Sequence, residues 1–594
     1  MKNKIILYLL AIVFIGSACQ ESILDREPLD KIAESAVFTS APLIDANLNR
    51  LYADTYFRYH GSYYIYEDIR EMLLGGELRD RGNWYGQANY VDHQLMDETR
   101  DGIVPLWQYS HVRNINEFIE KLTAAEDVAG MDDELKAVKL AEARFLRAFT
   151  YFEMSKRYGA VPLITEAQKI PESETDSSLY VSRNAEKEIY EFIEGECNAI
   201  APVLLEPGAM GNGRVHKYAV WAFKARAMLY AASIAKNGTQ QLNGLLGFPA
   251  SEAQSYYQKA YDAAKEVANG GYALYSAESD KTTNYQMLFL DEDNVEVIFS
   301  EKFNGLDKKG HNWSLFAWPG GASRVGWGAE AMPYLETALV YDYINGKSGM
   351  EDRALLESDE KIDFVELWKD KDPRFHASML YPGAMFAGYP VYAHDGTYVE
   401  GELNTEQEFV GEYNGFDWFA KSPWSRFHNR TGFTIKKFLN EPLGTQVKNY
   451  EDDVDRIIFR YAEILLITAE TALELNKPGE ALDAINQIRE RAGMPALTSV
   501  TFDDIIHERD VELMFENHKY WDYRRWRIAE TKLSEPRGGM QVYFDWDTKK
   551  YEVNVLDDVD RRIRYFGPQH YYMPIKLSRI SNNPNLAPEN PGYN

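Results

Sequence analysis

Apolar residues recur at three- and four-residue steps through the first large block of the chain, residues 133–236. Leu135 and Val138 begin this pattern, which places apolar side chains on one face of an α-helix. The pattern stops at Gly159, and Pro162 follows. A glycine at the C-terminus of a helix and a proline shortly after it end helices, so the first helix is predicted to end at Gly159. Further helices are predicted at residues 185–200, 217–236 and 254–268.

A second helical block covers residues 456–528. Its periodicity predicts helices at residues 457–475, 480–492 and 501–527. The small side chain of Ala462 and the turn at Asn476–Gly479 are typical of a tetratricopeptide helix pair. Thr501 and Asp504 have the spacing of a capping box. Such pairs bury their apolar faces only by stacking on neighbours, so we expect the two blocks to form one scaffold.

The chain between these blocks, residues 271–450, is rich in Gly, Pro, Trp and Tyr and has little sustained period, although residues 295–301 suggest a short strand. Long irregular segments in a compact body usually carry function. We therefore expect a mainly α fold: a tetratricopeptide-like helix-pair scaffold with a long, loop-rich insertion and minor β structure. The expected limits are a signal peptide at 1–18 and one domain at 19–594, with the scaffold at about 30–270 and 451–530, the ligand-facing insertion at about 271–450 and a C-terminal segment at 531–594.

The N-terminus resembles a bacterial lipoprotein signal. Lys2 and Lys4 precede an apolar run at residues 5–15, which is too short to span a bilayer but suits a secretory signal. Small residues lead to Cys19, the expected lipidation site, although position 16 is Gly where such signals usually have Leu. Gln20 follows the cysteine and suits export to the outer membrane, so we expect a lipid-anchored protein exposed at the cell surface.

Charge and cysteine content narrow the classes of partner. The formal net charge is −28, which repels polyphosphate and argues against nucleic acid as a partner. It suits a neutral ligand better than an anionic one. Aromatic residues make up 13% of the chain, enough for a large core and for surfaces that stack on sugar rings. Of the two cysteines, Cys197 lies in a helical pattern and is expected to be a buried structural thiol.

Two clusters combine aromatic rings with polar side chains on glycine-containing segments. Sugar rings present C–H faces that Trp or Tyr planes cover, while Asp, Asn or Arg bond the hydroxyl groups. The alternative for each tryptophan is packing within a loop. We predict ligand contacts at Asp80, Arg81, Asn83, Trp84 and Tyr85, and at Asn312, Trp313, Trp318, Arg324 and Trp327.

Acidic runs offer the one cofactor candidate. Asp291–Asp293, and Asp452 with Asp453 and Asp455, carry carboxylates of the kind that calcium prefers. Neither run has the regular spacing of a known calcium loop, and a solvated acidic turn is the alternative. We expect no catalytic residues and no cofactor other than such a structural calcium ion.

Several segments resemble the SusD/RagB family and run in the family's order along most of the chain. They are AEARFLRA at 141–148, YGAVPL at 158–163, GRVHK at 213–217, KDPRF at 371–375, FRYAEI at 459–464, NQIRERAG at 486–493, WDYRRW at 521–526, NPNL at 583–586 and NPGY at 590–593. Each alone is weakly specific, whereas the ordered set is specific. Most of these residues belong to the scaffold and do not identify a ligand.

The resemblance implies a surface lipoprotein that binds an oligosaccharide and passes it to a SusC-like TonB-dependent transporter in the outer membrane. It implies no catalysis. A peptide-binding member of the same family is an open alternative. So are a helical glycoside hydrolase, for which 92 Asp and Glu residues offer carboxylate pairs, and a repeat scaffold that binds proteins.

Overall fold

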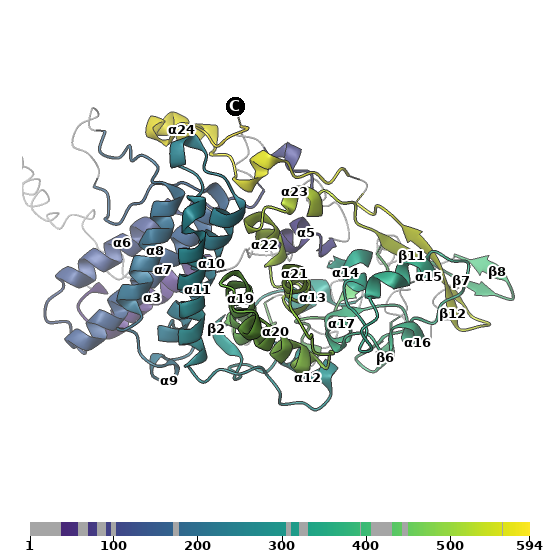
Figure 1. Cartoon of the computed structure of the whole chain (residues 1–594). Helices are drawn as coiled ribbons and strands as arrows, with labels where there is room; N and C mark the ends of the chain where they lie inside the picture. The colour runs from purple at the N-terminus through teal and green to yellow at the C-terminus, as the bar shows by residue number, and fades with distance from the viewer. Residues whose placement is uncertain are drawn as a thin grey trace, which may run out of the picture.

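The computed structural model describes residues 37–57, 69–79, 91–96, 103–169, 177–304, 310–319, 331–391, 394–405, 431–441, 450–560 and 562–593. Helices dominate this part of the chain, so the prediction of a mainly α fold with minor β structure is confirmed. The helices of the first block gather at one end of the molecule and the small sheet lies at the other (Figure 1). Among the described helices, none is both long and apolar enough to cross a membrane.

The first block is built from packed helices whose ends follow local rules. Its members are α3 (Ala41–Asp54), α6 (Tyr109–Ala124), α7 (Asp133–Tyr158), α8 (Glu186–Ile200), α10 (Lys217–Asn237) and α11 (Ala253–Ala268). The side chain of Asp132 accepts a hydrogen bond from Leu135 N and starts α7, and Gly159 ends this helix at a φ of 70°. α7 packs on α8, and α10 packs on α11, as the helical periodicity predicts.

The second block contains α19 (Tyr461–Glu474), α20 (Pro478–Ala492), α21 (Phe502–Glu512) and α22 (Lys519–Arg525). α19 packs on α20 as a helix pair, and α19 also contacts α11 of the first block. The predicted capping box is present, because Thr501 and Asp504 bond each other's backbone N–H groups. The two blocks therefore share one layer of helices although residues 269–460 separate them in sequence.

Two predicted helix limits are wrong. Residues 456–460 form strand β10 (Arg456–Arg460), which pairs antiparallel with β2 (Val297–Glu301). A short apolar run rich in Ile and Phe is compatible with a strand as well as with a helix. Here the neighbouring strand β2 supplies a pairing partner, and the run is a strand. The helix predicted at 501–527 is interrupted after Glu512, where Phe515 and Asn517 adopt positive φ angles.

The interruption after Glu512 has an identifiable cause in side chains that take over backbone hydrogen bonds. Arg460 Nη2 donates to the carbonyl oxygen of Glu512 at 2.8 Å, and Lys437 Nζ donates to that of Met514 at 2.8 Å. The N–H of Phe515 donates to the carboxylate of Glu77 at 2.7 Å. Tertiary contacts thus satisfy groups that a continuing helix would have satisfied.

A second hydrophobic core is built on rings of the insertion such as Trp313, Trp368 and Phe375, and residues from 69–78, 511–515 and 540–553 complete it. The sequence interpretation missed most of the short elements of the insertion, including helices α12 (Lys281–Met287) and α17 (Pro373–Ser378). It also missed a four-stranded sheet in the order β12-β11-β7-β8. This sheet joins β7 (Gly396–Val399) and β8 (Glu402–Asn404) of the insertion to a hairpin of β11 (Gly539–Asp545) and β12 (Lys550–Leu556).

A group of buried ion pairs, here called the Glu512 cluster, ties the insertion to the second block. Glu512 has an exposed fraction of 0%. Its carboxylate accepts hydrogen bonds from Arg460 at 2.6 Å, from Arg374 of α17 at 2.9 Å and from Arg491 of α20. Arg374 and Arg491 also pair with Glu508 and Glu296, respectively. Every charge in the cluster therefore has an opposite charge in contact, which offsets its removal from water.

Cys197 is a free, buried cysteine on α8, as the sequence predicts. Burial raises the pKa of the thiol well above its usual value. In a soluble form beginning at Gln20, Cys197 is the remaining cysteine of the two. We expect the native protein to react with Ellman's reagent at least roughly 100-fold more slowly than the denatured chain. Stopped-flow absorbance would measure both rates, and rapid labelling of the native form would contradict the burial of this thiol.

Candidate functional site

The predicted ligand residues divide into those that the structure describes and those that it does not. Asn312, Trp313 and Trp318 lie within the described residues. The remaining predicted positions lie outside them, namely Asp80, Arg81, Asn83, Trp84, Tyr85, Arg324 and Trp327, together with the lipidation site Cys19. For these residues the prediction from sequence stands as a prediction.

The chain segments that lead into the two predicted clusters are paired with each other. β1 (Leu78–Arg79) ends directly before Asp80, and β3 (Met332–Pro333) begins five residues after Trp327. The two strands are antiparallel, with Arg79 opposite Met332. Segments separated by about 250 positions in the sequence therefore adjoin paired strands, an arrangement that suits one binding site.

Further hydrogen bonds fix this pair of strands in place. Thr337 Oγ1 donates to the carbonyl oxygen of Glu77 at 2.6 Å, and Ile435 N donates to that of Ala331 at 3.1 Å. Arg79 donates to the carbonyl oxygen of Val559. The strand pair is thus held by the helix that follows β3 and by two distant parts of the chain, near residues 435 and 559, and a rigid base is what positions ligand-binding loops.

Trp313 and Trp318 are packed into the core of the insertion, each with an exposed fraction of 1%. Trp313 begins α13 (Trp313–Ala317); its Nε1 donates to the carbonyl oxygen of Lys437 at 3.2 Å, and its ring contacts that of Phe438. The ring of Trp318 meets Phe386 at a centroid distance of 5.0 Å. The structure therefore gives both rings a packing role, which is the alternative that the sequence left open for each tryptophan.

Asn312 and its neighbours hold another pair of chain segments together. The side-chain oxygen of Asn312 accepts a hydrogen bond from Tyr450 N at 2.7 Å, and His311 N donates to the carbonyl oxygen of Asp452 at 2.8 Å. Asn312 itself is buried. In this structure, the side-chain oxygen of Asn312 therefore holds the backbone at Tyr450 in place.

The two acidic runs proposed as calcium sites bind other groups. Asp293 and Asp455 both pair with Lys302, and Asp452 accepts a hydrogen bond from Ser314 N at 2.8 Å. Over the part of the chain that the structure describes, no group of three or more His, Cys, Asp or Glu side chains is placed to hold a metal ion. A lysine supplies the positive charge that calcium was expected to supply.

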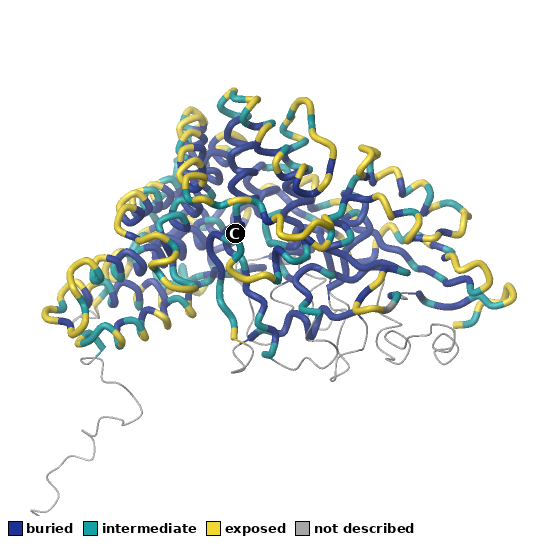
Figure 2. The backbone as a smooth tube through the Cα atoms, turned by 90° about the horizontal axis from the view of Figure 1, so that it is seen from below, coloured by how far each residue is buried: buried dark blue, intermediate teal, exposed yellow. Residues whose placement is uncertain are grey.

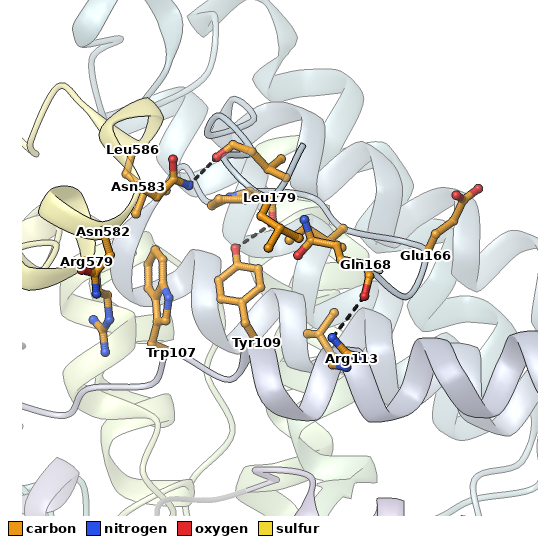
Figure 3. Close-up of a pocket in the computed structure, with 14 residues that line it drawn as sticks. Trp107, Tyr109, Arg113, Glu166, Gln168, Leu179, Arg579, Asn582, Asn583 and Leu586 are labelled. Atoms are coloured by element: carbon orange, nitrogen blue, oxygen red, sulfur yellow. Dashed lines mark hydrogen bonds between the residues drawn. The ribbon is translucent and has the colours of Figure 1, made fainter. Parts of the chain in front are cut away.

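The structure also contains a pocket that the sequence interpretation did not find. Its volume is about 300 Å³, and it lies between the start of α6, the chain after α7 and the C-terminal helix α24 (Leu577–Asn582) (Figure 3). We call it the α6–α24 pocket. It is lined by Trp107, Tyr109, Val112, Arg113, Pro162, Ile164, Glu166, Gln168, Leu179, Val181, Arg579, Asn582, Asn583 and Leu586.

Three hydrogen bonds tie the walls of the α6–α24 pocket together. Tyr109 Oη donates to the carbonyl oxygen of Pro162 at 2.7 Å, Arg113 donates to that of Gln168 at 3.1 Å, and Asn583 Nδ2 donates to that of Val181 at 2.9 Å. The sequence pattern that could have indicated this pocket is a Trp and a Tyr two residues apart at the start of a helix. Only the fold brings residues 579–586 to that position.

Comparison with known proteins identifies the family. A family model described as "SusD family" matches residues 295–593, and a model described as "Starch-binding associating with outer membrane" matches residues 24–229. The starch-binding protein SusD of Bacteroides thetaiotaomicron is 24% identical over 485 residues, which cover 79% of this chain and 75% of that protein.

Solved structures show the same fold. A SusD-like protein from Bacteroides fragilis superposes with a TM-score of 0.70 at 21% identity, covering 96% of this chain and all of that one. Surface glycan-binding protein A from Bacteroides thetaiotaomicron, solved in complex with laminarihexaose, gives a TM-score of 0.62 at 18% identity, covering 93% of this chain and all of that one. The first family model alone spans half of the chain, and this protein therefore belongs to the SusD family.

Proposed function

We propose that this protein captures an oligosaccharide at the outer membrane and passes it to a partner SusC-like TonB-dependent transporter, without catalysing a reaction. The body is tethered through lipid on Cys19 and faces the cell surface. Two findings support the proposal: the family model described as starch-binding and associated with the outer membrane, and the relative solved with a bound glucan.

The pairing of β1 with β3 is the observation that carries the proposed site. It joins the bases of the two aromatic and polar segments that the sequence singles out, with Arg79 opposite Met332. An oligosaccharide needs ring faces and hydroxyl partners within one site. We therefore assign ligand contact to Trp84 and Tyr85 with Asp80, Arg81 and Asn83 from one segment, and to Arg324 and Trp327 from the other.

Replacing Trp84 with alanine is expected to weaken oligosaccharide binding at least roughly tenfold, because one stacking ring and its buried area are lost. Isothermal titration calorimetry of the soluble form beginning at Gln20, against plant, microbial and host oligosaccharides and mixed peptides, measures this effect. Trp84 is preferred to Trp313 for the test, because alanine at a core tryptophan costs about 3–5 kcal/mol of stability and would confuse unfolding with lost binding.

The matched control is Trp221→Ala, since Trp221 lies on α10 in the scaffold and is only partly buried. We expect this variant to bind like the parent. Equal affinities for the parent and Trp84→Ala would refute the site assignment. Binding of peptides alone would move the protein to peptide uptake, and release of reducing ends during incubation would overturn the non-catalytic proposal.

A further inference from the structure

The α6–α24 pocket presents two aromatic rings held in fixed positions. Trp107 and Tyr109 lie 5.1 Å apart between ring centroids, and Trp107 also packs edge-on against Tyr158 at 5.1 Å. The hydroxyl group of Tyr109 donates to the carbonyl oxygen of Pro162, which holds the far end of this side chain in place. Both rings stand on the pocket wall (Figure 3), and both side chains are partly exposed. Fixed aromatic surface costs little ordering entropy when a ligand binds.

Polar side chains with unused hydrogen-bonding capacity line the same pocket. The side-chain amides of Gln168 and Asn582 and the carboxylate of Glu166 bond to no other described residue, and Gln168 is half-buried while the other two are exposed. They come from two segments about 410 positions apart in the sequence and line one cavity. Amides offer both donors and acceptors, which is the combination that a hydroxyl group needs.

The charges around the pocket are balanced, which favours a neutral ligand. Arg113 is paired with Glu117 at 2.8 Å, and the guanidinium of Arg579 lies 4.7 Å from the ring centroid of Trp107. Glu166 supplies a negative charge at the other side of the pocket (Figure 3). The residues that line the pocket therefore carry charges of both signs, which favours neither an anionic nor a cationic ligand.

We propose that the α6–α24 pocket is a second carbohydrate-binding site that takes a short neutral sugar unit, with Trp107 and Tyr109 against the ring and Gln168 and Asn582 bonded to hydroxyl groups. The choice of a sugar rests on the proposed function. The volume of about 300 Å³ is at the lower end for ligand pockets, about 300–1,000 Å³, and so suits one or two sugar rings.

This site is separate from the one assigned to the 80–85 and 324–327 segments. Its lining residues in the described part of the chain fall at 107–113, 162–168, 179–181 and 579–586, and therefore outside the insertion. A glycan held at the insertion would leave this pocket free. The protein would then hold two parts of one long glycan, or two glycans, which increases retention by raising the effective concentration of the second unit.

Fluorine NMR of the soluble protein labelled with 5-fluorotryptophan tests the proposal. The signal of Trp107, assigned by its loss in Trp107→Phe, should shift saturably on titration with D-glucose, D-galactose, D-mannose, D-xylose or laminarihexaose. Asn582→Ala and Gln168→Ala should each raise the midpoint about three- to tenfold. Both residues bear side chains without partners in the described structure, so these variants are expected to fold. The signal of Trp221 should not move.

The possible results distinguish the second site from the site assigned to the 80–85 and 324–327 segments. If no sugar of the panel shifts the Trp107 signal, or if Asn582→Ala and Gln168→Ala leave the midpoint unchanged, the second site is refuted. If Trp84→Ala abolishes the shift, the pocket is not an independent site and the inference also fails. If the Trp107 shift persists in Trp84→Ala while calorimetric affinity is unchanged by that substitution, the assignment to the 80–85 and 324–327 segments fails and the second site stands.

Discussion

Replacing Glu512 with alanine is expected to lower the free energy of unfolding by about 3–5 kcal/mol, because it leaves buried guanidinium groups without their counter-charge. The carboxylate of Glu512 contacts Arg374, Arg460 and Arg491, and its exposed fraction is 0%. Urea denaturation followed by circular dichroism would measure the loss. Because the cluster joins the insertion to the scaffold, we also expect the unfolding transition of the variant to broaden or divide.

An exposed glutamate on a neighbouring helix provides the control. Glu490 lies on the exposed face of α20, and Glu490→Ala should change stability by less than about 0.5 kcal/mol. Burial raises the pKa of Glu512, but Arg491, Arg460 and Arg374 outweigh this effect and hold the pKa well below its usual range. The stabilisation from this group is therefore present above its unfolded pKa of about 4.5 and is lost as the pH falls from there toward its lowered folded pKa. A Glu512→Ala variant as stable as the parent would contradict this account.

Replacing Glu77 with glutamine is expected to stabilise the protein by about 2–4 kcal/mol above pH 8 and to have little effect near pH 5. Glu77 is fully buried, and burial raises its pKa to about 8. Between pH 4.5 and about pH 8, the folded state therefore retains on Glu77 a proton that the unfolded chain has lost. The native protein loses stability as the pH rises through this range. Glutamine cannot ionise, so the variant should lack this loss.

The geometry around Glu77 makes glutamine a close substitute for the protonated acid. Glu77 Oε1 accepts the hydrogen bond from Phe515 N, while Oε2 has no partner among the described residues. Thermal denaturation at several pH values would compare the parent with Glu77→Gln and with Glu530→Gln, an exposed control on α23 (Ala529–Lys532). Parallel pH profiles for the parent and Glu77→Gln would mean that Glu77 is ionised in the folded state, contrary to its environment.

The scaffold was the part of the fold that the sequence could predict. α7, α8, α10, α11 and α20 lie within one or two residues of their predicted limits, because a sustained period and local caps determine a helix. The break after Glu512 was not predictable in this way, since it depends on Arg460, Lys437 and Glu77, which are distant in the sequence. The strand at 456–460 was not predicted either, because its pairing partner near residue 299 is also distant in the sequence.

Candidate ligand residues were harder to predict, because a tryptophan near glycines can either bind a ligand or pack a core. Trp313 and Trp318 have the composition around them that the sequence associates with binding, yet both are buried. The α6–α24 pocket was not predicted because its lining residues are far apart in the sequence. Trp107 lies near other aromatic residues in the sequence. Asn582, which lines the same pocket, lies 475 positions later, and only the fold brings it there.

The pairing of β2 with β10 has a consequence for how the insertion can diversify. The pairing closes the insertion at its base, with Glu301 opposite Arg456. The entropic cost of closing a flexible loop grows only with the logarithm of its length. Lengthening the insertion by half with flexible chain would cost the scaffold only about 0.4 kcal/mol. Mutation can therefore add or remove whole loops above this base, and so reshape the site that we propose there, while the helices beneath keep their stability.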